Sequence, residues 1–110
     1  MNLIDENIVE SLKDILGDDY RALIDDFYAI SLAEIELIIN DFHSLSAEQQ
    51  KNKIHTLKGS SANIGAQYLS KLFMAIEIGL ETDSEYDLRL SLGRTKEYLE
   101  KTVQTLRAKV

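Results

Sequence analysis

The chain has 110 residues, of which 45% are hydrophobic, and it carries a formal net charge of −7 with no cysteine and no proline. This length and apolar content predict a single globular domain over residues 1–110 rather than a disordered segment. The missing cysteines exclude disulfides, thiolate metal sites and a cysteine nucleophile. The acidic balance argues against nucleic acid as a partner, because that binding needs cations that neutralise phosphates.

The hydrophobic pattern in the first half of the chain predicts two helices. The first, over residues 6–16, is capped by Asp5, ends at Gly17 and is short enough to lie as a lid across one end of a bundle. Its apolar stripe is Ile4, Ile8, Leu12 and Ile15. The second helix is expected over residues 19–42 and has a broad apolar stripe, which indicates that more than one neighbour covers it. Most of its buried face is expected from Tyr20, Leu23, Phe27, Ile30, Leu37 and Ile38, and the stripe is broadened by Leu32, Ile35, Ile39 and Phe42.

The second half of the chain predicts three more helices and no strand. Ser46 and Gln49 have the spacing of a capping box, so the third helix begins at Ala47, and it ends near Gly65. The fourth covers residues 66–82, and the fifth covers residues 85–107 with Ser84 as its cap. Their inward-facing residues are Leu69, Leu72, Phe73, Ile76 and Leu80, then Leu88, Leu92, Leu99, Val103 and Leu106, with Thr95 and Thr102 on or near the last stripe. Four long amphipathic helices joined by short breaks predict an all-α fold, an antiparallel up-down four-helix bundle with the short first helix added.

The third predicted helix carries a histidine that should face water. Its apolar stripe is Ile54, Leu57, Ser61 and Ile64, and at about 100° per residue His55 falls well off that stripe. A neutral imidazole is nucleophilic near pH 7, because its ordinary pKa is about 6.5. Such an exposed ring suits a group that gives and takes an anionic phosphoryl, although a lone surface histidine usually has no such role.

Small and cationic residues share the predicted face of His55. They are Lys51, Lys58, Gly59 and Ala62. A glycine inside a helix costs roughly 1 kcal/mol against alanine, so Gly59 is best explained by a partner that approaches the backbone closely. Residues 46–76 hold one acidic and four basic residues, whereas residues 1–45 hold eleven acidic and two basic ones. This basic island around His55 indicates an anionic partner surface, although a charge run is often only a solvated face.

At these residues the sequence resembles a known family. The stretch His55-Thr56-Leu57-Lys58-Gly59-Ser60-Ser61, followed by Asn63-Ile64-Gly65-Ala66 and Leu69, is similar to the signature of histidine-containing phosphotransfer (HPt) domains. The resemblance is specific from Ile54 to Glu77. It implies that His55 is phosphorylated on Nε2, that Lys58 lies near the phosphoryl oxygens, and that Gly59 leaves room for an incoming receiver domain.

Other residues have less certain roles. Glu77 lies where the family often has a glutamate or glutamine that accepts a hydrogen bond from the ring Nδ1–H, but a plain surface glutamate is an equal alternative. Lys51 either steers the partner or is simply solvated. Glu81 stands about where many family members have a basic residue, which leaves the fine specificity for partners open. His43 is interpreted as a surface or capping residue.

The resemblance implies a monomeric cytoplasmic phosphocarrier. Its expected partners are the receiver domains of a hybrid sensor kinase and of a response regulator. No apolar run approaches the roughly 20 residues of a membrane-spanning helix, and residues 1–6 lack the features of a secretory signal, so no membrane role is expected. With no glycine-rich phosphate loop and no grouped metal ligands, we expect no cofactor, no metal and no ATP-dependent kinase activity.

Three alternatives stay open at this point. The chain could be an HPt-like module that docks receivers but no longer transfers, against which intact His55, Lys58 and Gly59 argue. It could be a structural helical bundle in which the motif is a coincidence. A histidine kinase's dimerising domain would need an attached ATP-binding domain, for which 110 residues leave no room.

Overall fold

The computed structural model describes residues 2–110, so Met1, the first residue of the expected domain, lies outside the described residues. These residues form five α-helices and one 3₁₀ turn, which are α1 (Glu6–Leu16), α2 (Asp19–Asn40), η1 (Phe42–Ser44), α3 (Ala47–Ile64), α4 (Gln67–Thr82) and α5 (Leu88–Arg107). No strand occurs between residues 2 and 110. The predicted all-α fold class and the five predicted helices are therefore confirmed.

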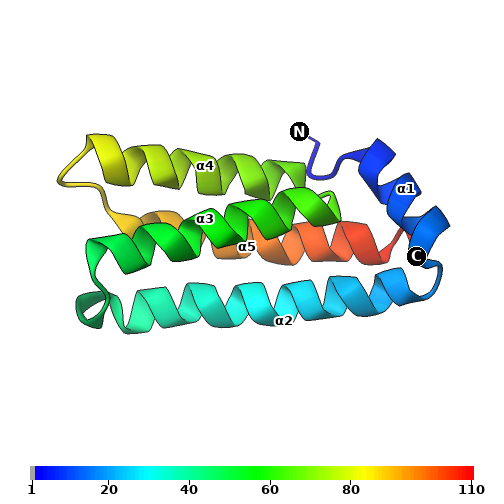
Figure 1. Cartoon of the computed structure of the whole chain (residues 1–110), viewed down its shortest axis with the longest axis horizontal. Coiled ribbons are helices and arrows are strands. Elements are labelled where there is room, and N and C mark those ends of the chain that lie inside the picture. The colour runs from blue at the N-terminus through cyan, green and yellow to red at the C-terminus, as the bar shows by residue number, and fades with distance from the viewer. Residues whose placement is uncertain (1) are drawn as a thin grey trace.

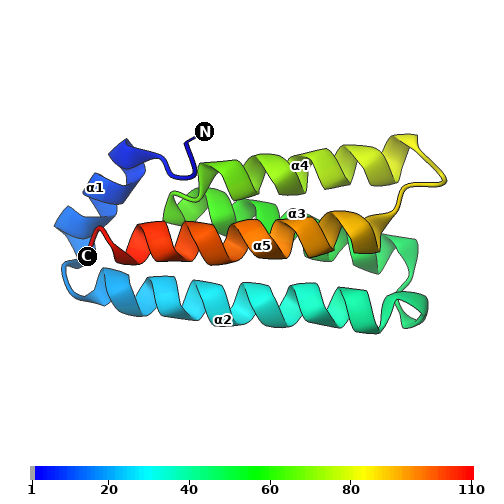
Figure 2. The same ribbon diagram turned by 180° about the vertical axis from the view of Figure 1, so that it is seen from behind.

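The four long helices lie side by side along the long axis of an elongated molecule of 43 × 23 × 20 Å (Figure 1). Their colours show that the chain reverses direction at each connection from α2 to α5. The short helix α1 is tilted across the end of the molecule where α5 finishes, and the C-terminus lies at that end (Figure 2). Helix α3 packs beside α4 and α2, so each of these helices supplies side chains to the edges of its outer surface.

Local signals set the ends of α1 and α3 as predicted. The Asp5 carboxylate accepts hydrogen bonds from the backbone N–H groups of Asn7 and Ile8, and Ser46 and Gln49 make both bonds of a capping box. Helix α3 ends at Gly65, whose φ of 92° lies in the left-handed region that favours glycine.

Gly65 also seats α1 against the end of α3. A Cβ atom at this position would come within 3.0 Å of Val9 Cγ2 on α1, and the Gly65 carbonyl accepts a 2.8 Å hydrogen bond from the Asp5 backbone N–H. The glycine therefore terminates the helix that carries His55 and gives α1 room to close this end of the core.

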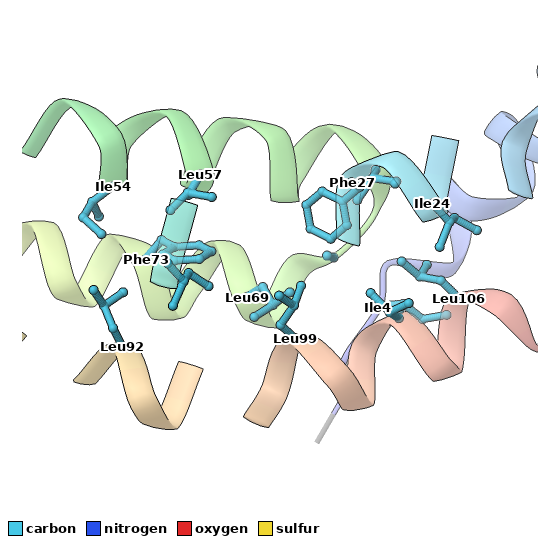
Figure 3. Close-up of a cluster of buried hydrophobic side chains, with 14 of the residues drawn as sticks. Ile4, Ile24, Phe27, Ile54, Leu57, Leu69, Phe73, Leu92, Leu99 and Leu106 are labelled. Carbon is cyan, nitrogen blue, oxygen red and sulfur yellow. The ribbon is translucent and has the colours of Figure 1, made fainter. Parts of the chain in front are cut away.

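The core fixes the orientation of α3. Figure 3 shows apolar side chains of several helices meeting between the ribbons, among them Ile54, Leu57, Phe73 and Leu92. All four predicted stripe residues of α3 are buried, including Ser61. Each fully buried large apolar side chain contributes roughly 1.5–3 kcal/mol, so turning α3 about its axis to bury His55 would be strongly unfavourable.

The predicted buried face of α2 is partly wrong. Leu23, Ile30 and Leu37 are 41%, 64% and 38% exposed. The residues of α2 that are buried are Tyr20, Ile24, Phe27, Ser31, Ile35 and Ile38. Helix α2 has apolar residues on several of its sides, so their spacing alone does not show which side is buried. Its contacts with α3 and α5 determine the buried side. The predicted stripe of α1 also fails at Ile15, which is 77% exposed.

Three predicted helix boundaries also shift. Helix α2 ends at Asn40 rather than at residue 42, because Phe42 begins η1, and the Gln50 side chain donates to the Phe42 carbonyl in this turn. Helix α4 begins at Gln67, one residue later than predicted. Helix α5 begins at Leu88 with Asp87 as its cap, and not at residue 85 with Ser84, because the Asp87 carboxylate accepts the N–H of Leu90.

Candidate functional site

His55 lies on the outer surface of α3, as its spacing predicted. Its side chain is 70% exposed, while the neighbouring Ile54 is fully buried. The imidazole therefore stands on the surface of the molecule, where a second protein can reach it.

Glu77 reaches His55 from α4. Its Oε2 atom lies 3.2 Å from the ring Nδ1, and its side chain is 22% exposed. An ionised carboxylate can only accept hydrogen bonds, so this contact is a hydrogen bond when Nδ1 carries the proton. The geometry thus favours the tautomer in which Nε2 keeps its lone pair and is free to attack.

Lys58 holds the other oxygen of the same carboxylate. Its Nζ lies 2.6 Å from Glu77 Oε1. Glu77 is therefore ionised at neutral pH, because the adjacent Lys58 ammonium, with a smaller contribution from His55, lowers its pKa despite the opposing effect of burial. Lys58 and His55, which are three positions apart on α3, form one connected polar cluster with Glu77 of α4.

The basic island predicted from the sequence is largely neutralised in the folded chain. Lys53 pairs with Glu34 of α2 at 2.9 Å, and Lys51 lies 3.8 Å from Glu81 of α4. With the Lys58 pair, three of the four island lysines face a glutamate from a neighbouring helix. The surface around His55 is therefore less positive than the charge count along the sequence indicated.

Gly59 and Ala62 are both exposed on α3, on the side of His55. A Cβ atom added to Gly59 would meet no atom within 4 Å, and the φ of Gly59 is not in the positive region. Neither packing within the chain nor backbone conformation requires a glycine here. The prediction that Gly59 serves a close approach from outside is consistent with this geometry.

The exposed side chains of α2 extend this surface in a way that the sequence interpretation missed. One groove between α2 and α3 is lined by Leu23, Ile30, Ser60 and Asn63, among others. A second, lined by Ile30, Ser60 and Thr56 among others, lies further along the same two helices. The sequence signal for this surface was that α2 has more apolar residues than one buried face can hold.

Other candidate features lie outside this cluster. The His43 ring is exposed and packs edge-on against Phe42, with 5.5 Å between the ring centroids. Within residues 2–110 no three histidine or carboxylate side chains are grouped so that they could hold a metal ion. No helix in this range is long and apolar enough to cross a membrane.

Comparison with known proteins identifies the class. The family model described as Hpt domain matches residues 8–109, and the chain therefore belongs to the Hpt domain family. Membership gives the chain a histidine phosphotransfer role in a phosphorelay, and proteins of this family are phosphocarriers rather than kinases.

A solved structure has the same fold. The crystal structure of histidine-containing phosphotransfer protein B (HptB) from Pseudomonas aeruginosa PAO1 aligns with a TM-score of 0.84 and 18% sequence identity, over 96% of this chain and 92% of that chain. A search of curated protein sequences found no match.

Proposed function

We propose that His55 is the phosphorylated residue. The Nε2 lone pair attacks the phosphorus of a phosphoaspartate on the receiver domain of a hybrid sensor kinase, so that a P–N bond forms while the P–O bond to the aspartate breaks. An aspartate of a response regulator then attacks the phosphohistidine, and Nε2 leaves. The observation that carries this proposal is the exposed His55 ring with its Nδ1 held by Glu77 at 3.2 Å.

The residues beside the ring have distinct roles in this proposal. Glu77 fixes the tautomer and stabilises the positive charge that the ring develops as the P–N bond forms. Lys58 lies on the same helix face and pairs with the Glu77 carboxylate at 2.6 Å. The receiver supplies the metal ion and most of the transition-state stabilisation, so this chain acts as a phosphocarrier without ATP-dependent kinase activity.

The proposed docking surface is the outer face of α3 and the adjoining edge of α2. Gly59 and Ala62 form its flat floor beside His55, and Lys51 lies at its rim. Ile30, which is 64% exposed, adds an apolar contact that would be buried only when a partner docks. Because most of the island lysines are paired with glutamates, apolar contact should contribute more to receiver docking than the sequence indicated. Long-range electrostatic steering of the receiver should contribute less.

The remaining parts of the proposal concern the chain as a whole. We propose that it acts as a monomer in the cytoplasm, where receiver domains are available, and that residues 1–110 form one HPt-like domain. The fold is proposed to be an antiparallel four-helix bundle of α2–α5 with α1 across one end. Nucleic acid and membranes are not among the proposed partners.

Phosphate transfer from a panel of phosphorylated receiver domains tests this function, with His55→Gln as the control. Acid-labile, alkali-stable phosphate on the wild-type chain only would support His55 as the carrier. Docking without transfer would instead favour a binding module, and the absence of both would leave a structural bundle. His55→Gln should keep the melting temperature almost unchanged, since a substitution at an exposed site usually alters stability by less than about 0.5 kcal/mol.

A further inference from the structure

We propose that Lys58 is a positioning residue, which acts on His55 through Glu77 by holding one carboxylate oxygen so that the other faces the ring Nδ1. This inference rests on the proposed function of His55 and goes beyond it. The resemblance to the family places Lys58 near the phosphoryl oxygens. In the structure its ammonium instead lies 2.6 Å from Glu77 Oε1.

The first argument is the geometry of the carboxylate. Glu77 Oε1 is 2.6 Å from Lys58 Nζ, and Glu77 Oε2 is 3.2 Å from His55 Nδ1. The two oxygens of one planar group are thus assigned to two different partners. Without the lysine, the glutamate side chain would be fixed by the single longer contact to the ring and would regain rotamer freedom.

The second argument is the location of Lys58 itself. The Lys58 side chain is 28% exposed, compared with 70% for His55, so the lysine lies deeper between α3 and α4. Its backbone carbonyl also accepts a hydrogen bond of 3.3 Å from the Ser70 hydroxyl of α4. Lys58 is therefore tied to α4 through both its main chain and its side chain, in the arrangement that holds Glu77 in place.

The tautomer of His55 gives a direct readout. We expect long-range proton–nitrogen spectra of the wild-type imidazole, recorded at alkaline pH, to show the Nδ1–H form in excess. Lys58→Met keeps the aliphatic length and removes the cation, and it should lower the ratio of Nδ1–H to Nε2–H about fivefold, within the net range that one ordinary hydrogen bond provides. Lys58→Arg keeps a cation and should largely restore the ratio.

Lys53→Met is the matched control. Lys53 is also on α3 and pairs with a glutamate, Glu34 of α2, at 2.9 Å. The substitution removes the same charge from the same helix without touching Glu77, so the tautomer ratio should not change. A wild-type ratio in Lys58→Met would overturn the positioning role, and Lys58→Gln provides a second truncation should the methionine variant fold poorly.

A second readout separates this inference from the proposed function. Phosphoramidate, a small donor that needs no docking partner, transfers its phosphoryl to a histidine nitrogen and releases ammonia. Lys58→Met should slow the formation of Nε2-phosphohistidine in parallel with the loss of the Nδ1–H tautomer, while Lys53→Met should not. Loss of phosphorylation with an unchanged tautomer would show that Lys58 acts on the phosphoryl directly, which overturns the inference but leaves His55 as the carrier. A tautomer shift in a chain that accepts phosphate from no receiver would refute the proposed function and leave the positioning role standing.

Discussion

Gly59 provides a sharp test of the proposed docking surface. Its added Cβ would meet no atom within 4 Å, so replacement by alanine or glutamine introduces no clash inside the chain. Glycine is roughly 0.5–1 kcal/mol less favourable than these residues in a helix interior. We therefore expect Gly59→Gln to raise the free energy of unfolding by about that amount, and the melting temperature by about 2–4 °C for a chain of this size.

Gly93 supplies a matched control on α5. It is also exposed, and a Cβ atom there would again meet nothing within 4 Å. Figures 1 and 2 show α3 and α5 on opposite faces of the molecule. Gly93→Gln should therefore give a similar gain in stability without any effect on a partner that docks over His55.

Thermal unfolding and receiver transfer together decide the question. Gly59→Gln should slow transfer at least tenfold, because the added side chain would fill the space that the backbone of the docked partner needs. Gly93→Gln should transfer at the wild-type rate. Unchanged transfer in Gly59→Gln would refute the close-approach argument. A loss of stability in Gly59→Gln alone would show instead that the glycine is needed within the fold.

Three further predictions follow from the same surface. The pKa of Glu77 is lowered in the folded chain, so its contribution to stability is present above the unfolded pKa and is lost as the pH falls through the folded pKa. The difference in unfolding free energy between wild type and Glu77→Gln should therefore shrink from pH 7 towards pH 3 in denaturant titrations. A difference that stays constant would contradict this prediction. Ile30→Ser should weaken receiver docking several-fold in titration calorimetry with little change in stability. Leu90→Ser, at a 54% exposed site on α5, should leave docking unchanged. Equal effects of the two substitutions would refute the role of the α2 edge in docking. Glu81→Gln releases Lys51 from its 3.8 Å partner and should raise the association rate with acidic receivers about twofold at low salt, and a gain that persists at about 1 M salt would not be electrostatic.

Local signals in the sequence were sufficient for the five helices and for the caps of α1 and α3, but not for the cap of α5. Asp5, Ser46 and Gly65 each act within a few residues of their own position, through side-chain caps or a left-handed backbone. The exposure of His55 was also predictable, because α3 has a single narrow apolar stripe. For α2 the same reasoning failed at Leu23 and Ile30, because a helix with apolar residues on several sides gives no unique inward direction.

The charges around His55 could not be read from the sequence in the same way. Glu77 was predicted to face the ring only through the family resemblance, and its spacing of 22 residues from His55 carries no local meaning. The pairing of Lys53 with Glu34 depends on the packing of α3 against α2 and joins residues 19 positions apart. Such contacts exist only after the helices have been placed, so a count of charges along the chain overestimates the potential at the surface.

The exposure of the His55 ring has a consequence for the chemistry. The ring is 70% exposed, so water surrounds much of it and the electrostatic stabilisation available from this chain alone is weak. In the proposed function, the fold aligns a single nitrogen through Glu77 and Lys58, whose side chains are less than one third exposed. A phosphoryl group on the proposed carrier His55 would then transfer slowly unless a receiver supplies the catalytic groups. We therefore expect the identity of the docked receiver, rather than the chemistry of this chain, to determine the rate of phosphoryl transfer.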